Sequence, residues 1–144
     1  MRKCSWYTLW VVLTCVALGC GPGQQGPPRG AVRGTVQLDQ IPIEQGYITF
    51  TPIRDTQGQA VSAMIVDGDY SLSKSKGPMV GWNRVQISSK GKTGNKIEAG
   101  SPHPPGTMID EIAEVIPMRY NMESTLEQEV ESAKNVADFS LTSE

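Results

Sequence analysis

The sequence predicts an all-β fold, specifically a seven-stranded antiparallel β-sandwich. Apolar and polar residues alternate with a period of two from Ala31 onward, which is the pattern of half-buried strands. Turn-forming residues separate these short runs, and no long stretch carries the spacing of an amphipathic helix. Short strands punctuated by turns are typical of two sheets packed face to face.

Seven segments carry the alternating pattern. In the first, Val32 and Val36 lie on one face of the expected strand, and Arg33 and Thr35 lie on the other. An Asp-Gly pair at positions 67 and 68 separates two later segments, and such a pair tolerates the positive φ of a tight hairpin turn. The segments are 31–38, 47–51, 60–66, 69–73, 84–88, 126–130 and 137–141.

Residues 89–117 depart from this pattern. They are rich in Gly, Lys, Asn, Ser and Pro, and so long a connection in a small domain is usually functional or disordered. Within it, Ile109, Ile112 and Ile116 stand at helical spacing, and Pro117 ends the pattern. We therefore expect a long loop that holds a short helix at one end of the sandwich.

The first 30 residues are expected to be a signal and a tether. Arg2 and Lys3 precede an uncharged apolar stretch at 6–18, which is shorter than the roughly 20 residues that a spanning helix needs. Residues 21–30 are rich in Gly, Pro and Gln, as flexible tethers are. The chain thus divides into a signal peptide at 1–19, a cysteine and tether at 20–30, and one domain at 31–144.

Cys20 is the expected site of lipid attachment. Its surroundings resemble the bacterial lipobox, at which a signal peptidase cleaves ahead of a diacylglyceryl cysteine. Burial of acyl chains such as palmitate contributes about 0.8 kcal/mol per methylene, so three chains give lasting attachment. With Gly21 after the cysteine, the resemblance implies the cell envelope, at the outer membrane or the periplasmic face. The alternative is an ordinary secretory signal, which leaves Cys20 unmodified or removes it.

Composition argues against several functional classes. The formal net charge is −2 with scattered charges, whereas a nucleic-acid partner requires a basic stripe. Cys4 and Cys15 fall in the signal, so the folded domain has no thiol. His103, the only histidine, has no second histidine or cysteine for a triad or zinc site, and we interpret it as a solvated loop residue. We expect no catalytic residue, metal or cofactor.

Three aromatic residues are candidates for a binding surface. Tyr47, Trp82 and Tyr120 could stack on a sugar or pack against a partner protein. Packing in the core or at a sheet edge is the alternative interpretation. Trp82 is the favoured candidate because it follows Gly81 at the start of a strand, where a side chain can lie across a loop.

Turn and core residues carry a family resemblance over nearly all of 31–142. Residues 32–37, 41–43 and 46–52 resemble the opening of bacterial carboxypeptidase regulatory-like domains, and 67–72 resembles their Asp-Gly-Tyr hairpin. The stretches 116–126 and 134–141 resemble the ending of small planctomycete-type lipoproteins of this class. The resemblance implies a transthyretin-like sandwich and says little about activity.

We expect a lipid-anchored binding or structural module of the cell envelope. It would contact the membrane through the lipid and take an envelope protein or a glycan as its partner. A carrier of a small molecule or glycan is the alternative, and a saturable small ligand would distinguish it. A transthyretin-like hydrolase is a third hypothesis, which requires a polar cleft with a base beside a nucleophile.

Overall fold

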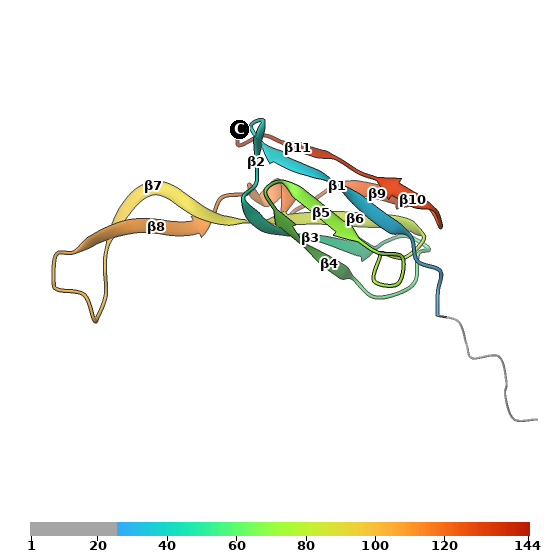
Figure 1. Ribbon diagram of the computed structural model, residues 1–144, viewed down its shortest axis with the longest axis horizontal. Coiled ribbons are helices and arrows are strands. Elements are labelled where there is room, and N and C mark those ends of the chain that lie inside the picture. The colour runs from blue at the N-terminus through green and yellow to red at the C-terminus, as the bar shows by residue number, and fades with distance from the viewer. Residues whose placement is uncertain (1–25) are drawn as a thin grey trace, which may run out of the picture.

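The computed structural model describes residues 26–144 (Figure 1), so the predicted signal peptide and Cys20 lie outside the described residues. The seven segments predicted from the sequence are all strands, and the described residues contain four further strands that the pattern did not predict. The elements are β1 (Ala31–Leu38), β2 (Ile41–Pro42), β3 (Gln45–Pro52), β4 (Val61–Val66), β5 (Asp69–Leu72), β6 (Gly81–Ser88), β7 (Lys90–Glu98), β8 (Met108–Glu114), the 3-10 helix η1 (Met118–Tyr120), β9 (Glu127–Val130), β10 (Lys134–Val136) and β11 (Phe139–Leu141).

One curled sheet forms the body of the molecule. Its strands lie in the order β10-β1-β5-β4-β3-β6-β9, and β2 and β11 also pair with β1. Residues 131–133 join the two ends of this order, β9 and β10, and the four steps from Val130 to Lys134 span at most about 14 Å. The sheet must therefore fold back on itself, which gives two facing layers and confirms the all-β, sandwich-like fold.

Pairing is antiparallel except along one side of β1. There, β10 and β11 run parallel to β1 at the same register offset, with a break at Ala137 and Asp138. The Asp138 carboxylate fills the break, because it accepts hydrogen bonds from the Thr35 backbone N–H at 2.7 Å and the Thr35 hydroxyl at 3.0 Å. β10 and β11 are thus one strand that bends past Gly34.

The alternating apolar residues form a single core between the layers. Phe50 and Tyr70 pack with ring centroids 6.1 Å apart, and the buried Tyr70 hydroxyl donates to the Ala137 carbonyl at 2.7 Å. Burial of each large apolar side chain contributes about 1.5–3 kcal/mol before entropy is counted. Fully buried apolar members include Val32, Val36, Ile48, Phe50, Ile65, Val85, Ile87 and Val130.

The expectation of a loop with a short helix at 89–117 is wrong. Lys90–Glu98 and Met108–Glu114 are the strands β7 and β8, which form a separate two-stranded sheet. Ile109 pairs across the hairpin with Ile97, and Ile112 pairs with Lys92, so both belong to a strand ladder. The only helical turn near this segment is η1, which begins after Pro117. We call this hairpin the arm.

Candidate functional site

The arm projects from one end of the sandwich, opposite to the end where the described chain begins (Figure 1). β7 has nine residues and rises about 3.3 Å per residue, so the arm reaches roughly 30 Å. Among the described residues no third strand pairs with β7 or β8, so both edges of the arm keep unpaired backbone N–H and C=O groups. Such edges are templates for an added strand.

Charged side chains stabilise one face of the arm. The Asp110 carboxylate lies 2.7 Å from the Lys92 ammonium and 3.2 Å from the Lys96 ammonium. Hydrogen bonds from Lys92 and then Lys96 hold the pKa of Asp110 below its ordinary value, and the hydrogen bond to Asp110 raises the pKa of Lys92. These pairs are exposed, so each contributes little on its own, but together they bridge a register irregularity between Lys92 and Lys96.

On the opposite face a carboxylate holds the same irregular stretch. Glu111 Oε2 accepts from the Thr93 hydroxyl at 2.6 Å and from the Asn95 amide at 3.1 Å. The Thr93 hydrogen bond, followed by that of Asn95, lowers the pKa of Glu111. The arm is therefore braced by side chains on both faces, which explains how a two-stranded sheet without a core keeps its shape.

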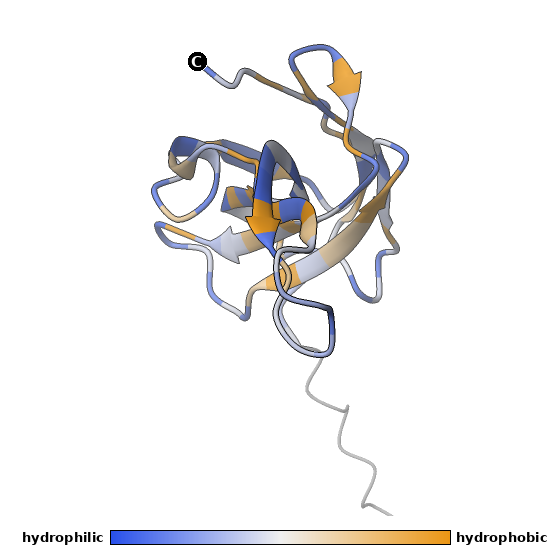
Figure 2. Ribbon diagram, turned by 90° about the vertical axis from the view of Figure 1, so that its left-hand side faces the viewer, coloured by the Kyte–Doolittle hydropathy of each residue, from blue (hydrophilic) through white to orange (hydrophobic). Residues whose placement is uncertain are grey.

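Large apolar side chains stay exposed along the arm. Ile97 and Ile109 are a directly opposed pair, and Met108 and Ile112 lie on the other face among the charges. Ile112 is 65% exposed, although full burial of an isoleucine contributes about 1.5–3 kcal/mol. Figure 2, in which the arm points toward the viewer, shows apolar residues interspersed with polar ones along it. The exposed apolar residues of the arm are thus one pair on one face and two separate residues on the other.

Glu114 fixes the direction in which the arm leaves the body. Its Oε1 accepts the backbone N–H of Ser89 at 2.8 Å and that of Ile116 at 3.0 Å. The Ser89 hydroxyl in turn donates to the Gln45 carbonyl at 2.6 Å, which ties the root of the arm to β3. These contacts tie the root of the arm to the body, so the arm is not a hinged loop.

A groove of about 790 Å³ opens where the arm meets the body. One wall is apolar and comes from the β1–β2 corner, where Ile41 is 69% exposed. The facing wall is the base of the arm. Charged residues stand on both sides of the opening. We call this the distal groove; its lining includes Leu38, Asp39, Ile41, Pro42, Ile43, Glu44, Lys90, Lys92, Ile112 and Val115.

The three predicted aromatic residues do not share one surface. Tyr47 is exposed on β3 opposite Met64, and it pairs with Ser88 at the far end of β6 from Trp82. Six residues of strand separate Ser88 from Trp82, which is about 20 Å. Tyr120 lies in η1, half-buried.

Arginine side chains cover two of these aromatic rings. The Arg54 guanidinium lies 4.4 Å from the Trp82 ring centre and also pairs with Glu127. The Arg119 guanidinium lies 4.8 Å from the ring centre of Tyr120, whose hydroxyl is 3.3 Å from that of Thr142. Trp82 does lie against a loop, as its position after Gly81 suggested, and it is half-buried there.

The structure also shows the position of the only histidine and bears on metal binding and membrane-spanning helices. His103 is exposed in the turn at the tip of the arm. Within residues 26–144, no group of three or more His, Cys, Asp or Glu side chains gathers closely enough to hold a metal ion. The same residues include no helix with the length and apolar character needed to cross a membrane.

Sequence reasoning missed the arm and the distal groove. A partial signal for the arm was present, because Lys90, Lys92 and Lys96 alternate with uncharged residues, but 108–114 shows no alternation. Ile109, Ile112 and Ile116 are spaced as in a helix, and this spacing led to the wrong prediction of a helix.

Comparison with models of protein families, with curated proteins and with solved structures finds no match for this chain.

Proposed function

We propose that this chain is a lipid-anchored β-sandwich of the bacterial cell envelope, of the carboxypeptidase regulatory-like kind, that binds a protein rather than catalysing a reaction. The arm is the observation that carries the proposal. It combines two free strand edges with an exposed Ile97–Ile109 pair, which are the two features that strand addition by an extended segment uses. The partner would be an envelope protein that contributes one extended strand with alternating apolar side chains.

Position-specific photo-cross-linking tests the proposal. A photoreactive amino acid at Ile112 on the arm should give one discrete cross-linked protein in intact envelopes, whereas the same group at exposed Glu129 on β9 should not. The double variant Ile97→Ser, Ile109→Ser should reduce the yield at Ile112 by about tenfold or more, because two partly exposed isoleucines lose their apolar contact.

The matched control is Tyr47→Ser, Met64→Ser, which removes an exposed apolar pair from the body instead. It should leave the cross-linking yield unchanged. An equal yield in both double variants would show that the apolar pair of the arm does not bind the partner.

A second candidate function is favoured by the distal groove. Its volume of about 790 Å³ lies in the range of small-molecule sites, and its lining combines apolar walls with a few charged residues. This supports the carrier hypothesis. Titration with an apolar anionic fluorophore tests it: a carrier should show saturable binding that Ile41→Glu, at the exposed corner of the groove, abolishes. Binding unaffected by that substitution would dismiss the groove as the site.

A further inference from the structure

The end of the sandwich nearest the N-terminus carries an unpaired basic patch. We call this end the tether pole and define its patch as Arg29, Arg33, Lys74, Lys76 and Lys134. Three segments bring these residues together: the start of β1, the loop after β5 and the start of β10. Among residues 26–144, the ion pairs involve Arg54, Lys92 and Lys96, so no member of the patch is neutralised by one.

Backbone contacts hold the patch together as one surface. Arg29 donates to the Gly77 carbonyl at 2.8 Å, and the Gly30 N–H donates to the Pro78 carbonyl at 3.0 Å, so the loop that bears Lys74 and Lys76 lies against the incoming chain. Lys134 is directly opposite Ala31 in the β1–β10 ladder. The basic groups are therefore presented by anchored segments and not by free loops.

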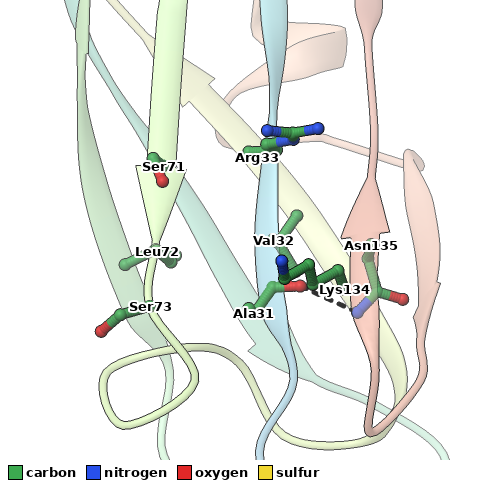
Figure 3. Close-up of a pocket in the computed structure, with 8 residues that line it drawn as sticks. All are labelled: Ala31, Val32, Arg33, Ser71, Leu72, Ser73, Lys134 and Asn135. Carbon is green, nitrogen blue, oxygen red and sulfur yellow. Dashed lines mark hydrogen bonds between the residues drawn. The ribbon is translucent and has the colours of Figure 1, made fainter.

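A shallow hollow of about 180 Å³ lies within the patch (Figure 3). Residues from β1, β5 and β10 surround it, including Arg33, Lys134 and Ser71, and Ser73 of the loop after β5 completes the lining. The Asn135 amide closes one side by donating to the Ala31 carbonyl at 2.9 Å. Two cations and the Ser71 hydroxyl around one hollow suit a phosphate group.

Charge is distributed unevenly between the two ends of the body. The turns at the opposite end carry Asp39, Glu44 and Asp67, all of them exposed. The acids near the patch are Glu129 and Glu131 around the end of β9, Asp55 on the neighbouring loop, and Asp69 and Asp138, which line a second hollow with Arg33. A chain with a net charge of −2 thus presents a basic surface at one end.

We propose that the tether pole rests on the anionic phospholipid surface to which Cys20 is anchored, so that the arm points away from the membrane. This inference rests on the proposed lipid anchor. Nine residues from Cys20 to Arg29 span at most about 32 Å, so the anchor keeps the pole within reach of the headgroups. The electrostatic attraction between the basic patch and the anionic headgroups falls off within about 8–10 Å at physiological salt. The patch therefore contributes only when the tether pole lies at the membrane surface.

Quenching by headgroup-labelled lipid tests this orientation in the reconstituted full-length lipoprotein. Its mature form has Cys20 as the only natural cysteine, so Ser132→Cys at the tether pole and His103→Cys at the tip of the arm can each carry one fluorophore. In vesicles with about one third phosphatidylglycerol, we expect strong quenching at position 132 and none at 103. Vesicles of phosphatidylcholine alone, or 0.5 M salt, should relieve the quenching at 132.

Two charge variants make the test specific. Lys74→Gln, Lys76→Gln, Lys134→Gln should weaken the surface contact on the order of 100-fold, at about fivefold per lysine. Lys90→Gln, Lys92→Gln, Lys96→Gln removes the same charge from the arm and should leave quenching at 132 unchanged. Equal quenching in neutral and anionic vesicles, or equal effects of the two variants, would overturn the proposal.

Two measurements distinguish whether the proposed lipid anchor or the proposed membrane contact of the tether pole is wrong. The acyl mass on Cys20, measured by mass spectrometry, reports on the anchor alone. If the chain carries no acyl group, co-sedimentation of that chain with the same anionic vesicles tests the basic patch directly. Binding to a soluble polyanion but not to vesicles would assign the patch to another ligand and contradict the proposal.

Discussion

Gly34 occupies the point where β1 and the bent β10–β11 strand come closest. A Cβ built on Gly34 would lie 1.9 Å from the Ala137 carbonyl oxygen, which is far inside van der Waals contact. The same carbonyl accepts the hydrogen bond of the buried Tyr70 hydroxyl. Any movement of Ala137 that made room for a side chain would therefore disturb a core hydrogen bond as well.

We predict that Gly34→Ala lowers the free energy of unfolding by about 2–3 kcal/mol, because the backbone must shift to relieve the overlap. Gly100→Ala is the matched control: no atom lies within 4 Å of its Cβ, and the change should stay within about 0.5 kcal/mol. Urea denaturation followed by fluorescence of Trp82, the one tryptophan outside the predicted signal, measures both. Equal midpoints for the two variants would contradict the close approach.

For single residues, the sequence predicted which side chains of a strand face the core. It did not predict which residues distant in the sequence lie in contact. Val32 and Val36 are buried as the alternation required, and Asp67 and Gly68 both have positive φ in the tight β4–β5 turn. The sequence did not predict which surface side chains are covered by residues distant in the sequence. Trp82 owes its cover to Arg54, which belongs to the loop after β3, and no local pattern announces that contact.

At the scale of elements, the arm depends on charge more than the body does. Almost all of β7 is exposed, so the arm lacks a core of its own, and the cluster around Asp110 holds its two strands in register. Folding of the arm depresses the pKa of Asp110. The stabilisation is therefore present above the ordinary value of 3.8 and is lost as the pH falls through the folded value.

We predict that the arm loosens in acid before the body unfolds. Backbone amides of Gly91 and Ile97, which lie in hydrogen-bonded pairs of the hairpin, should lose protection from hydrogen exchange below the ordinary pKa of 3.8, while amides of β3 and β6 stay protected. Asp110→Asn should give the loosened arm at neutral pH. The raised pKa of Lys92 sets an alkaline limit. The stability that the Lys92 ammonium contributes to the arm is present below pH 10.5 and is lost at more alkaline pH. Equal acid sensitivity of Asp110→Asn and the natural chain would refute this role.

The seven predicted strands of the body were predictable because each has one buried face. The arm was not, since both of its faces meet solvent and its apolar positions do not mark an interior. β10 and the parallel pairing with β1 were also missed, because a period of two is the same in parallel and antiparallel strands. The candidate site was least predictable, since the distal groove joins residues some 70 positions apart in the sequence.

At the scale of the whole molecule, one side chain closes the sheet. The Asn135 side chain accepts the Glu131 N–H at 2.9 Å and donates to the carbonyls of Ala31 and Glu131 at 2.9 and 3.0 Å. It thus links β9, the short connection and β1, where the two ends of the sheet meet. The arm is outside this closure, since it leaves the body after Ser88 and returns before Ile116.

We predict that the body folds without the arm. Gly91 and Ala113 are directly opposed, so an Asn-Gly turn in place of residues 92–112 should close a two-residue hairpin without strain. The free energy of unfolding should change by less than about 1 kcal/mol, because the removed residues of β7 are all exposed. Urea denaturation measures this, and loss of a single cooperative transition would show that the arm supports the core.

The arm leaves the sandwich and returns to it at two fixed points. Its length can therefore change in evolution without altering the sandwich. Pairs of residues can be gained or lost on both strands near the tip while Ile97 and Ile109 keep facing the same side. A one-residue slip between the strands would instead turn one isoleucine to the opposite face. Descendants of this chain can therefore change how far the tip of the arm reaches from the body while the scaffold stays the same.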